Sequence, residues 1–317
     1  MELYLKNEND CEIPQGWIKA TFPPMHEFVE LLAEDLCQII RNEVTQRGFA
    51  CPTFDVEPHK NRHSLIAAYC SMLGRRIPKA NRRVHLSPSL SIPHEVAVGF
   101  ELLVRKFENG EDVNPHLNKF SAKLDKDDQL LYDWGINHFH LGTIIDASGF
   151  IQRTGPIAYA IVKESDVYII TVTEHGHWSD KNLLEIVDAN WPELISVWKI
   201  DGEWNVNFSS EEIGKLRKCG ITSGIRLANG NSYISPGGGI NCAGGSTLAV
   251  MEANKMYHRF RHLHKYFECK FYLDPKESYF QTNGPQINMR LKRQNNDLYL
   301  YLDNLDWELK WLKFHNL

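Results

Sequence analysis

The sequence lacks the long apolar runs and the leader pattern that would direct the chain into or across a membrane. No window reaches the roughly 18 uninterrupted apolar residues that a membrane helix requires. The first seventeen residues, MELYLKNENDCEIPQGW, are too polar for a secretory signal peptide. We therefore expect a cytoplasmic protein with no membrane-spanning segment.

Several chemical signatures are also missing. The seven cysteines are odd in number and never form a CxxC pair, so free thiols are expected and a structural zinc site is disfavoured. There is no GxSxG nucleophile elbow, no HExxH pair and no GxxxxGK[ST] phosphate loop. The net charge is −5, so any contact with nucleic acid would have to be local.

What is present is a chain of 317 residues with enough apolar side chains, 43%, to build one large core or several smaller ones. Apolar residues at three- and four-residue steps predict helices over 28–44, 61–74 and 94–108. The basic, proline-broken stretch over 75–95 is interpreted as a connection.

From residue 137 the apolar period changes to two. Phe139 and Leu141 fall on one face of a predicted strand, and His138 and His140 fall on the other. Two apolar runs, 156–162 and 167–172, flank a four-residue polar turn and predict a β-hairpin. A helix is expected to start at Ser179 or Asp180 and to stop at the residue before Pro192.

In the last third, the sequence predicts a β region over 217–234 and a helix from Thr247 onward, with a glycine-rich stretch over 235–246 between them. Two strands follow, over 287–293 and 298–302. The predicted fold class is therefore α+β. We expect a mainly helical region over 1–126, an antiparallel sheet with a histidine cluster over 127–208, and an α+β module with a glycine-rich loop and a basic helix over 209–317.

The histidines of the central region are the main candidates for chemistry. If the strand at 137 pairs with the hairpin, the two rings of His-Phe-His project from one sheet face about 7 Å apart. The hairpin would add further groups near them, which gives five candidate catalytic residues: His138, His140, Arg153, His175 and His177. Tyr159 and Trp178 are expected to contact the substrate.

This set fits more than one role. Imidazoles exchange protons near neutral pH, and arginine stabilises an anionic phosphorane. These are the functional groups needed to cleave RNA through its 2′-hydroxyl group without a metal. HxH on a strand can also present two metal ligands, although no carboxylate cluster adds to them. The same pattern also fits histidines that decorate a solvated sheet face or bind backbone groups. No cofactor or metal is expected.

The run from His138 to Gly142, then Arg153, then the hairpin IAYAIVKESDVYIITVTEHGHW, resembles the sheet core of the RelE/ParE-type ribonuclease toxins. The resemblance covers residues from about 133 to 190. It implies that Arg153 stabilises the transition-state anion, that His138 or His140 is a base, and that His175 or His177 is an acid.

Two further features suggest anion binding. The glycine-rich stretch, with Gly237, Gly238 and Gly239, precedes a helix and could direct backbone amides toward a phosphate, or could simply form a tight turn and helix cap. The helix after it carries Arg259 and Lys265, which could grip a phosphate backbone or lie on a solvated face.

The functional hypothesis from the sequence is a metal-independent endoribonuclease of toxin or anti-phage defence type, with RNA as substrate and an antitoxin protein as possible partner. One alternative is a regulatory protein that binds RNA or a nucleotide through the glycine-rich loop and the basic helix without turnover. Another is a nucleotide-dependent transferase.

Overall fold

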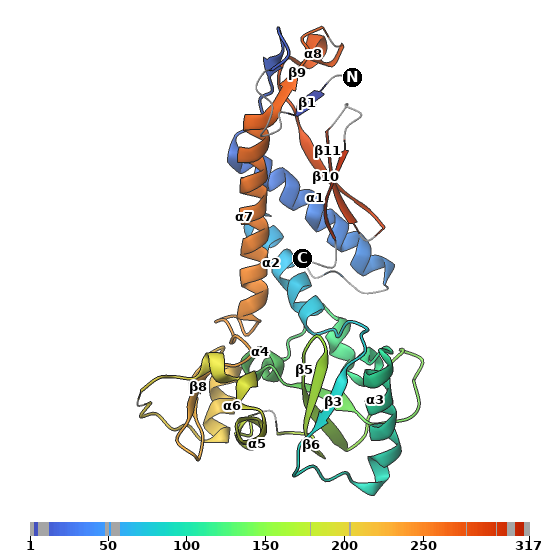
Figure 1. Cartoon of the computed structure of the whole chain (residues 1–317), viewed down its shortest axis with the longest axis vertical. Coiled ribbons are helices and arrows are strands. Elements are labelled where there is room, and N and C mark those ends of the chain that lie inside the picture. The colour runs from blue at the N-terminus through green and yellow to red at the C-terminus, as the bar shows by residue number, and fades with distance from the viewer. Residues whose placement is uncertain are drawn as a thin grey trace. The chain divides into compact units, whose positions relative to one another are not determined.

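The computed structural model describes residues 3–5, 13–47, 51, 58–177, 179–202, 204–276, 278–295, 297–302 and 308–313. It confirms the α+β class, with helices and several small sheets (Figure 1). The α-helices are α1 (Met25–Gln46), α2 (Pro58–Gly74), α3 (Ala97–Asn109), α4 (Gln129–Trp134), α5 (Asn182–Asn190), α6 (Ser210–Lys218), α7 (Thr247–Lys270) and α8 (Ser278–Asn283). The strands are β1 (Leu3–Leu5), β2 (Ile18–Lys19), β3 (Arg83–Leu86), β4 (Asn137–His140), β5 (Pro156–Val162), β6 (Asp166–Glu174), β7 (Gly224–Arg226), β8 (Ser232–Ile234), β9 (Phe271–Leu273), β10 (Met289–Gln294), β11 (Asp297–Leu302) and β12 (Glu308–Lys313).

The chain forms two compact units that do not follow its linear order. Unit 1 combines residues 1–70 with 250–317, and unit 2 comprises residues 71–249. The expected boundaries at 126 and 208 both fall inside unit 2, so the division into three consecutive regions differs from the one observed. Each boundary of unit 2 lies inside a helix, α2 or α7, where no proline- or glycine-rich linker marks it.

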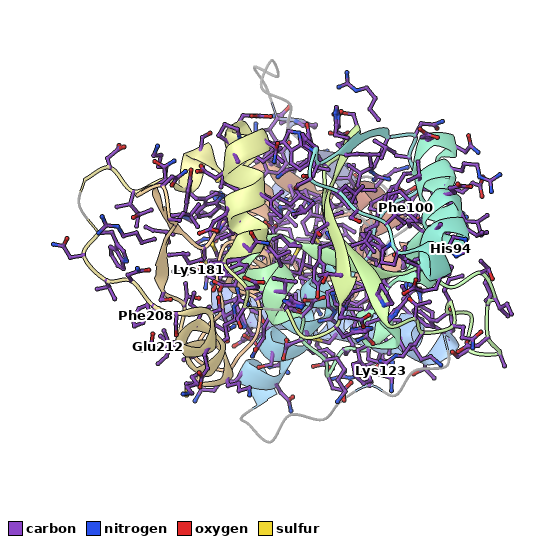
Figure 2. All side chains as sticks on the ribbon, turned by 90° about the horizontal axis from the view of Figure 1, so that it is seen from below. His94, Phe100, Lys123, Lys181, Phe208 and Glu212 are labelled. Carbon is purple, nitrogen blue, oxygen red and sulfur yellow. The ribbon has the colours of Figure 1, made fainter. Side chains whose placement is uncertain are left out.

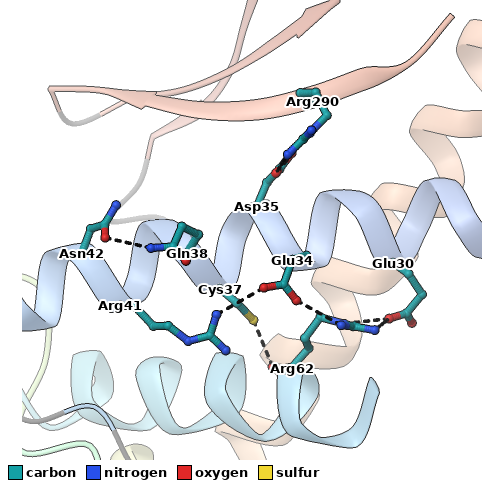
Figure 3. Close-up of polar contacts among 9 residues, drawn as sticks. All are labelled: Glu30, Glu34, Asp35, Cys37, Gln38, Arg41, Asn42, Arg62 and Arg290. Carbon is teal, nitrogen blue, oxygen red and sulfur yellow. Dashed lines mark hydrogen bonds and ion pairs between the residues drawn. The ribbon is translucent and has the colours of Figure 1, made fainter. Parts of the chain in front are cut away.

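Unit 1 is built from both ends of the chain. Strand β9 pairs antiparallel with β1 and with β2, and the β10-β11-β12 sheet packs on α1. Asp35 of α1 is buried and accepts hydrogen bonds from the guanidinium of Arg290 (Figure 3). It also accepts one from the backbone N–H of Leu291. Arg62 of α2 pairs with Glu30 on the other side of α1. The α1 surface is therefore held by charge-assisted hydrogen bonds as well as by its apolar stripe.

Unit 2 is organised around a four-stranded sheet with the order β3-β6-β5-β4. The predicted hairpin is confirmed as β5 and β6, and β4 pairs antiparallel with β5. Strand β3 pairs in parallel with β6 at the sheet edge. The interpretation of 75–95 as a connection was therefore wrong at β3, because four residues flanked by prolines carry too little alternation to indicate a strand.

Both faces of this sheet are covered. Helix α3, with Phe100 (labelled in Figure 2), Leu103 and Phe107, packs on one face. Helices α4, α5 and α6 and the β7-β8 hairpin supply the apolar cluster on the other face. The side chains of His138 and His140 project toward this second layer, so they are buried. Alternation on the strand was predicted correctly, but it gave no information on what covers each face.

Helix α6 was not expected. The segment over 217–234 was interpreted as β, but it begins inside α6 and only then continues to the β7-β8 hairpin. A capping box at Ser209 and Glu212, with both reciprocal hydrogen bonds formed, was the local signal that could have identified the start of the helix.

Within the described part of the chain, none of the helices combines the length and the apolar character needed to cross a bilayer.

Candidate functional site: a histidine cluster beside a cavity

Strand β4 places the two histidines of the His-Phe-His run. His138 lies opposite Tyr159 of β5 and His140 lies opposite Ile157, so both rings share the sheet face that packs against α5 and α6. Their exposed fractions are 6% and 2%. Phe139, between them, points into the core on the α3 side. The expectation that the two rings share one face is met, in a buried setting.

His140 occupies the interior end of the cluster. Its ring centroid lies 5.1 Å from that of His175. Neither ring nitrogen of His140 forms a hydrogen bond with any residue that the structure describes. Burial, together with the nearby charges of His175, His138 and Arg153, lowers the pKa of His140 to about 4. The ring is therefore neutral at pH 7.

His116 belongs to the same cluster, although the sequence did not single it out. It lies in a 3-10 helix (Asn114–His116), is buried, and its Nδ1 hydrogen-bonds the main-chain oxygen of His140 at 2.8 Å. Burial lowers its pKa to about 4 as well. An isolated histidine after a proline gives no periodic signal, which is why only the folded chain shows this residue.

Arg153 and His175 form the exposed side of the cluster. Burial, and the charges of His138 and Arg153, lower the pKa of His175. The mutual influence of these groups shows that His138, His140, His175 and Arg153 lie within electrostatic reach of one another. The structure thus brings together four of the five candidate catalytic residues.

The fifth candidate, His177, is engaged elsewhere. Its Nδ1 lies 3.2 Å from the carboxylate of Asp180 just before α5. Tyr159 belongs to the apolar cluster on the histidine face. Trp178 lies outside the described residues.

His138 also lines a cavity of about 580 Å³. The carboxylate of Asp128, at the N-cap of α4, lies 3.6 Å from Nδ1 of His138. Other polar and charged residues contribute to the wall: Arg75, Asn118, Ser121, Asp127, Gln129, Asn137, Ser179, Glu211, Lys215, Arg217 and Lys218. A histidine paired with a carboxylate in a cavity of this size is an arrangement suited to proton transfer on a bound small molecule or nucleotide.

Comparison with known proteins yields no match. No protein-family model, no curated protein and no solved structure matches the chain. The resemblance to ribonuclease toxins therefore stays a prediction.

No group of three or more histidine, cysteine, aspartate or glutamate side chains in the described ranges is arranged to hold a metal ion. Two carboxylates lie near these rings, that of Asp128 beside His138 and that of Glu174 near His175. The chemistry that these residues offer is proton transfer and anion stabilisation.

A buried ion pair supports the cavity wall. Nε of Arg217 donates to Asp133 at 2.7 Å, and its guanidinium lies 4.1 Å from the ring centroid of Trp134. Asp133 also accepts a hydrogen bond from the hydroxyl of Ser235. Because α4, α6 and the start of the glycine-rich stretch meet at this carboxylate, the pair fixes three segments around the cavity.

The interpretation of the glycine-rich stretch as an anion loop is corrected by its hydrogen bonds. The amides of Gly237 and Gly239 donate to the carbonyls of Asp133 and Tyr132, and that of Gly238 donates to Ser235. The amides of Gly237 and Gly239 cap the C-terminal end of α4, where helix carbonyls have no intrahelical partner. That of Gly238 closes a turn within the stretch, so none of the three is directed at a phosphate. The two alternative hypotheses that rely on this loop lose their main support.

Arg259 and Lys265 lie on the part of α7 that belongs to unit 1, whereas the histidine cluster belongs to unit 2. Lys265 is exposed and Arg259 is half-buried. The residues that form the site at β4 all belong to unit 2.

Proposed function

We propose that unit 2 is a metal-independent endoribonuclease of the toxin or anti-phage defence type. The observation that carries this proposal is the grouping of His138, His140 and His175 with the guanidinium of Arg153 at β4, where the imidazole of His138 lines a cavity beside a carboxylate. Cleavage of RNA through its 2′-hydroxyl group needs a base, an acid and a cation for the phosphorane, and these side chains supply all three.

His138 is the proposed base. It accepts the proton of the 2′-hydroxyl group, and the nearby Asp128 carboxylate stabilises the imidazolium that forms and orients the ring. The 2′-oxygen then bonds to phosphorus while the bond from phosphorus to the 5′-oxygen breaks. The negative charge on the phosphorane falls to Arg153, whose side chain is exposed beside His175.

His175 is the proposed acid. It donates its proton to the departing 5′-oxygen, so the products are a 2′,3′-cyclic phosphate and a free 5′-hydroxyl group. The lowered pKa of His175 makes its protonated form a stronger acid than an ordinary imidazolium. His140, neutral and packed against His175, is proposed as a positioning residue.

The test is RNA cleavage by the purified protein, measured with a fluorophore-quencher oligonucleotide. Replacing His138 and His140 together by glutamine, which keeps polarity and most of the volume, is expected to lower the rate by a factor of about 10² to 10⁴. Circular dichroism should be unchanged. Cleavage should persist in EDTA and disappear when the scissile nucleotide is 2′-deoxy.

The matched control is His85→Gln. His85 is also a histidine of unit 2 that contacts a carboxylate, that of Asp166 at 2.9 Å, but it lies on the edge strand β3 and does not belong to the cluster. Its variant should cleave at the wild-type rate. Cleavage that survives loss of both His138 and His140 would reject the proposal. If the proposal holds, the cellular partner to look for is a protein that restrains this activity.

A further inference from the structure

We propose that the cavity binds a single unpaired nucleotide of RNA, with its base stacked on Phe120. This names the substrate class of the same site and rests on the proposed function for the reaction that follows, but not for the binding itself. Phe120 lies in a 3-10 helix (Lys119–Ala122) and 43% of it is exposed. A single exposed ring is ordinary on a protein surface. What distinguishes this one is that it lines the same cavity as His138.

Two lysines lie beside this ring, and the ammonium of Lys126 also pairs with the carboxylate of Asp125 at 3.3 Å. The ammonium groups of Lys123 and Lys126 each lie 5.6 Å from the centroid of the Phe120 ring. An exposed lysine–ring contact is weak, and stacking of a nucleobase on an aromatic ring is stronger. A base can therefore replace a lysine at the ring face, and the ammonium of Lys123 can then pair with a phosphate of the same strand. An aromatic ring with flanking lysines is the combination that proteins use to bind single-stranded nucleic acid.

Hydrogen bonds hold the main chain of the segment that carries Phe120. The buried guanidinium of Arg75 donates to the main-chain oxygens of Lys123 and Lys126. The side chain of Asn118 accepts a hydrogen bond from the backbone N–H of Phe120 at 3.1 Å. Because these contacts hold the main chain, binding of a base has little backbone to order, which lowers its entropic cost.

The size of the cavity selects an unpaired nucleotide. About 580 Å³ suits a small-molecule ligand or a single nucleotide and is too small for a segment of duplex. In an A-form duplex the bases are stacked inside the helix and paired on their Watson–Crick edges, so none of them can reach a ring in a cavity. We therefore infer that single-stranded RNA, or the unpaired nucleotides of a loop, is bound and that duplex RNA is not.

The experiment measures equilibrium binding of a fluorescent single-stranded RNA in which every 2′-hydroxyl group is replaced by fluorine, so that cleavage cannot occur. Phe120→Ala is expected to weaken binding by a factor of about ten or more, and Phe120→Trp should retain it. Tyr266→Ala is the matched control, since Tyr266 is an exposed ring of unit 1 with Lys270 at 5.9 Å. Its affinity should equal that of the wild type. A duplex of the same sequence should compete at least tenfold less well.

Two results would overturn the inference: a Phe120→Ala variant that binds single-stranded RNA as tightly as the wild type, or a duplex that competes equally. Failure of the proposed function looks different. A protein that cleaves no RNA but binds single strands in a Phe120-dependent way keeps the inference and loses the nuclease assignment. A protein that cleaves RNA with the same KM after Phe120→Ala keeps the nuclease assignment and loses the inference.

Discussion

His116 and His140 are ionisable side chains in an interior that holds them in the neutral form. Both are buried, and burial is the largest cause of the lowered pKa in each case. In the unfolded chain the same imidazoles are solvated and titrate near pH 6.5. The folded and unfolded states therefore bind different numbers of protons over an interval of pH, which makes stability depend on pH.

The free energy of unfolding is expected to fall as the pH is lowered from about 6.5 to about 4. In this window the two imidazoles are protonated in the unfolded chain and remain neutral in the folded chain. The reason is that their pKa is about 4 in the folded state and about 6.5 in the unfolded state. The stabilisation is complete above pH 6.5 and is lost progressively below it. Each buried ring contributes about 3 kcal/mol at most. Urea denaturation at a series of pH values measures the slope.

His116→Gln and His140→Gln identify the source of that slope. Each variant removes one of the groups that titrates differently in the two states, so the loss of stability between pH 6.5 and pH 4 should become shallower. An unchanged slope in both variants would show that these rings do not titrate as described. Carboxylates with lowered pKa values, such as those of Asp146 and Asp166, also lose stabilisation below about pH 5, so the contribution of each imidazole is the difference in slope between the variant and the wild type.

The glycine-rich stretch and α4 form one structural unit, because the loop supplies the N–H groups that the end of this short helix lacks. A Cβ atom on Gly237 would lie 2.4 Å from the carbonyl oxygen of Leu131, and backbone atoms of Tyr132 and Gly135 are almost as close. This close approach of two main chains explains why the stretch has no side chain at that position.

Gly237→Ala is expected to destabilise the protein by about 2 kcal/mol, because the clash is with backbone and not with a movable side chain. The matched control is Gly74→Ala at the end of α2, where a Cβ meets nothing within 4 Å. That variant should be as stable as the wild type or slightly more stable. Thermal unfolding of the two variants, measured in parallel, tests this prediction. Equal melting temperatures would contradict the capping role.

Unit 2 has a complete apolar core of its own, with one cluster on each face of its sheet. Every residue of the histidine cluster and of the cavity wall also lies between residues 71 and 249. The unit is one continuous stretch of chain, whereas unit 1 needs both the first 70 residues and those from 250 onward. Independent folding is therefore expected of unit 2 and not of either half of unit 1.

A fragment comprising residues 71–249 is expected to unfold cooperatively on heating and to give the near-ultraviolet circular dichroism of a packed protein. A fragment of residues 1–70 is expected to give neither, because β9 and β10, which its elements pair with or pack on, are missing from it. A non-cooperative transition in the fragment 71–249 would show that its core depends on the rest of the chain.

Local patterns in the sequence were sufficient for the elements whose period is long or clear. The apolar stripes of α1 and α3, the β5-β6 hairpin and the helix after the glycine-rich stretch all lie where the sequence places them. Strand β3, with only four residues, and helix α6, whose main signal is a capping box, were missed because short elements carry little periodicity.

For the site, alternation along β4 placed His138 and His140 on one face, because side chains on any strand point alternately to its two sides. Burial of these rings, the pairing of His138 with Asp128, the addition of His116 and the division of the chain into two units followed from tertiary contacts alone. Such contacts join residues that are far apart in the sequence, so a local sequence pattern cannot predict which residues form them.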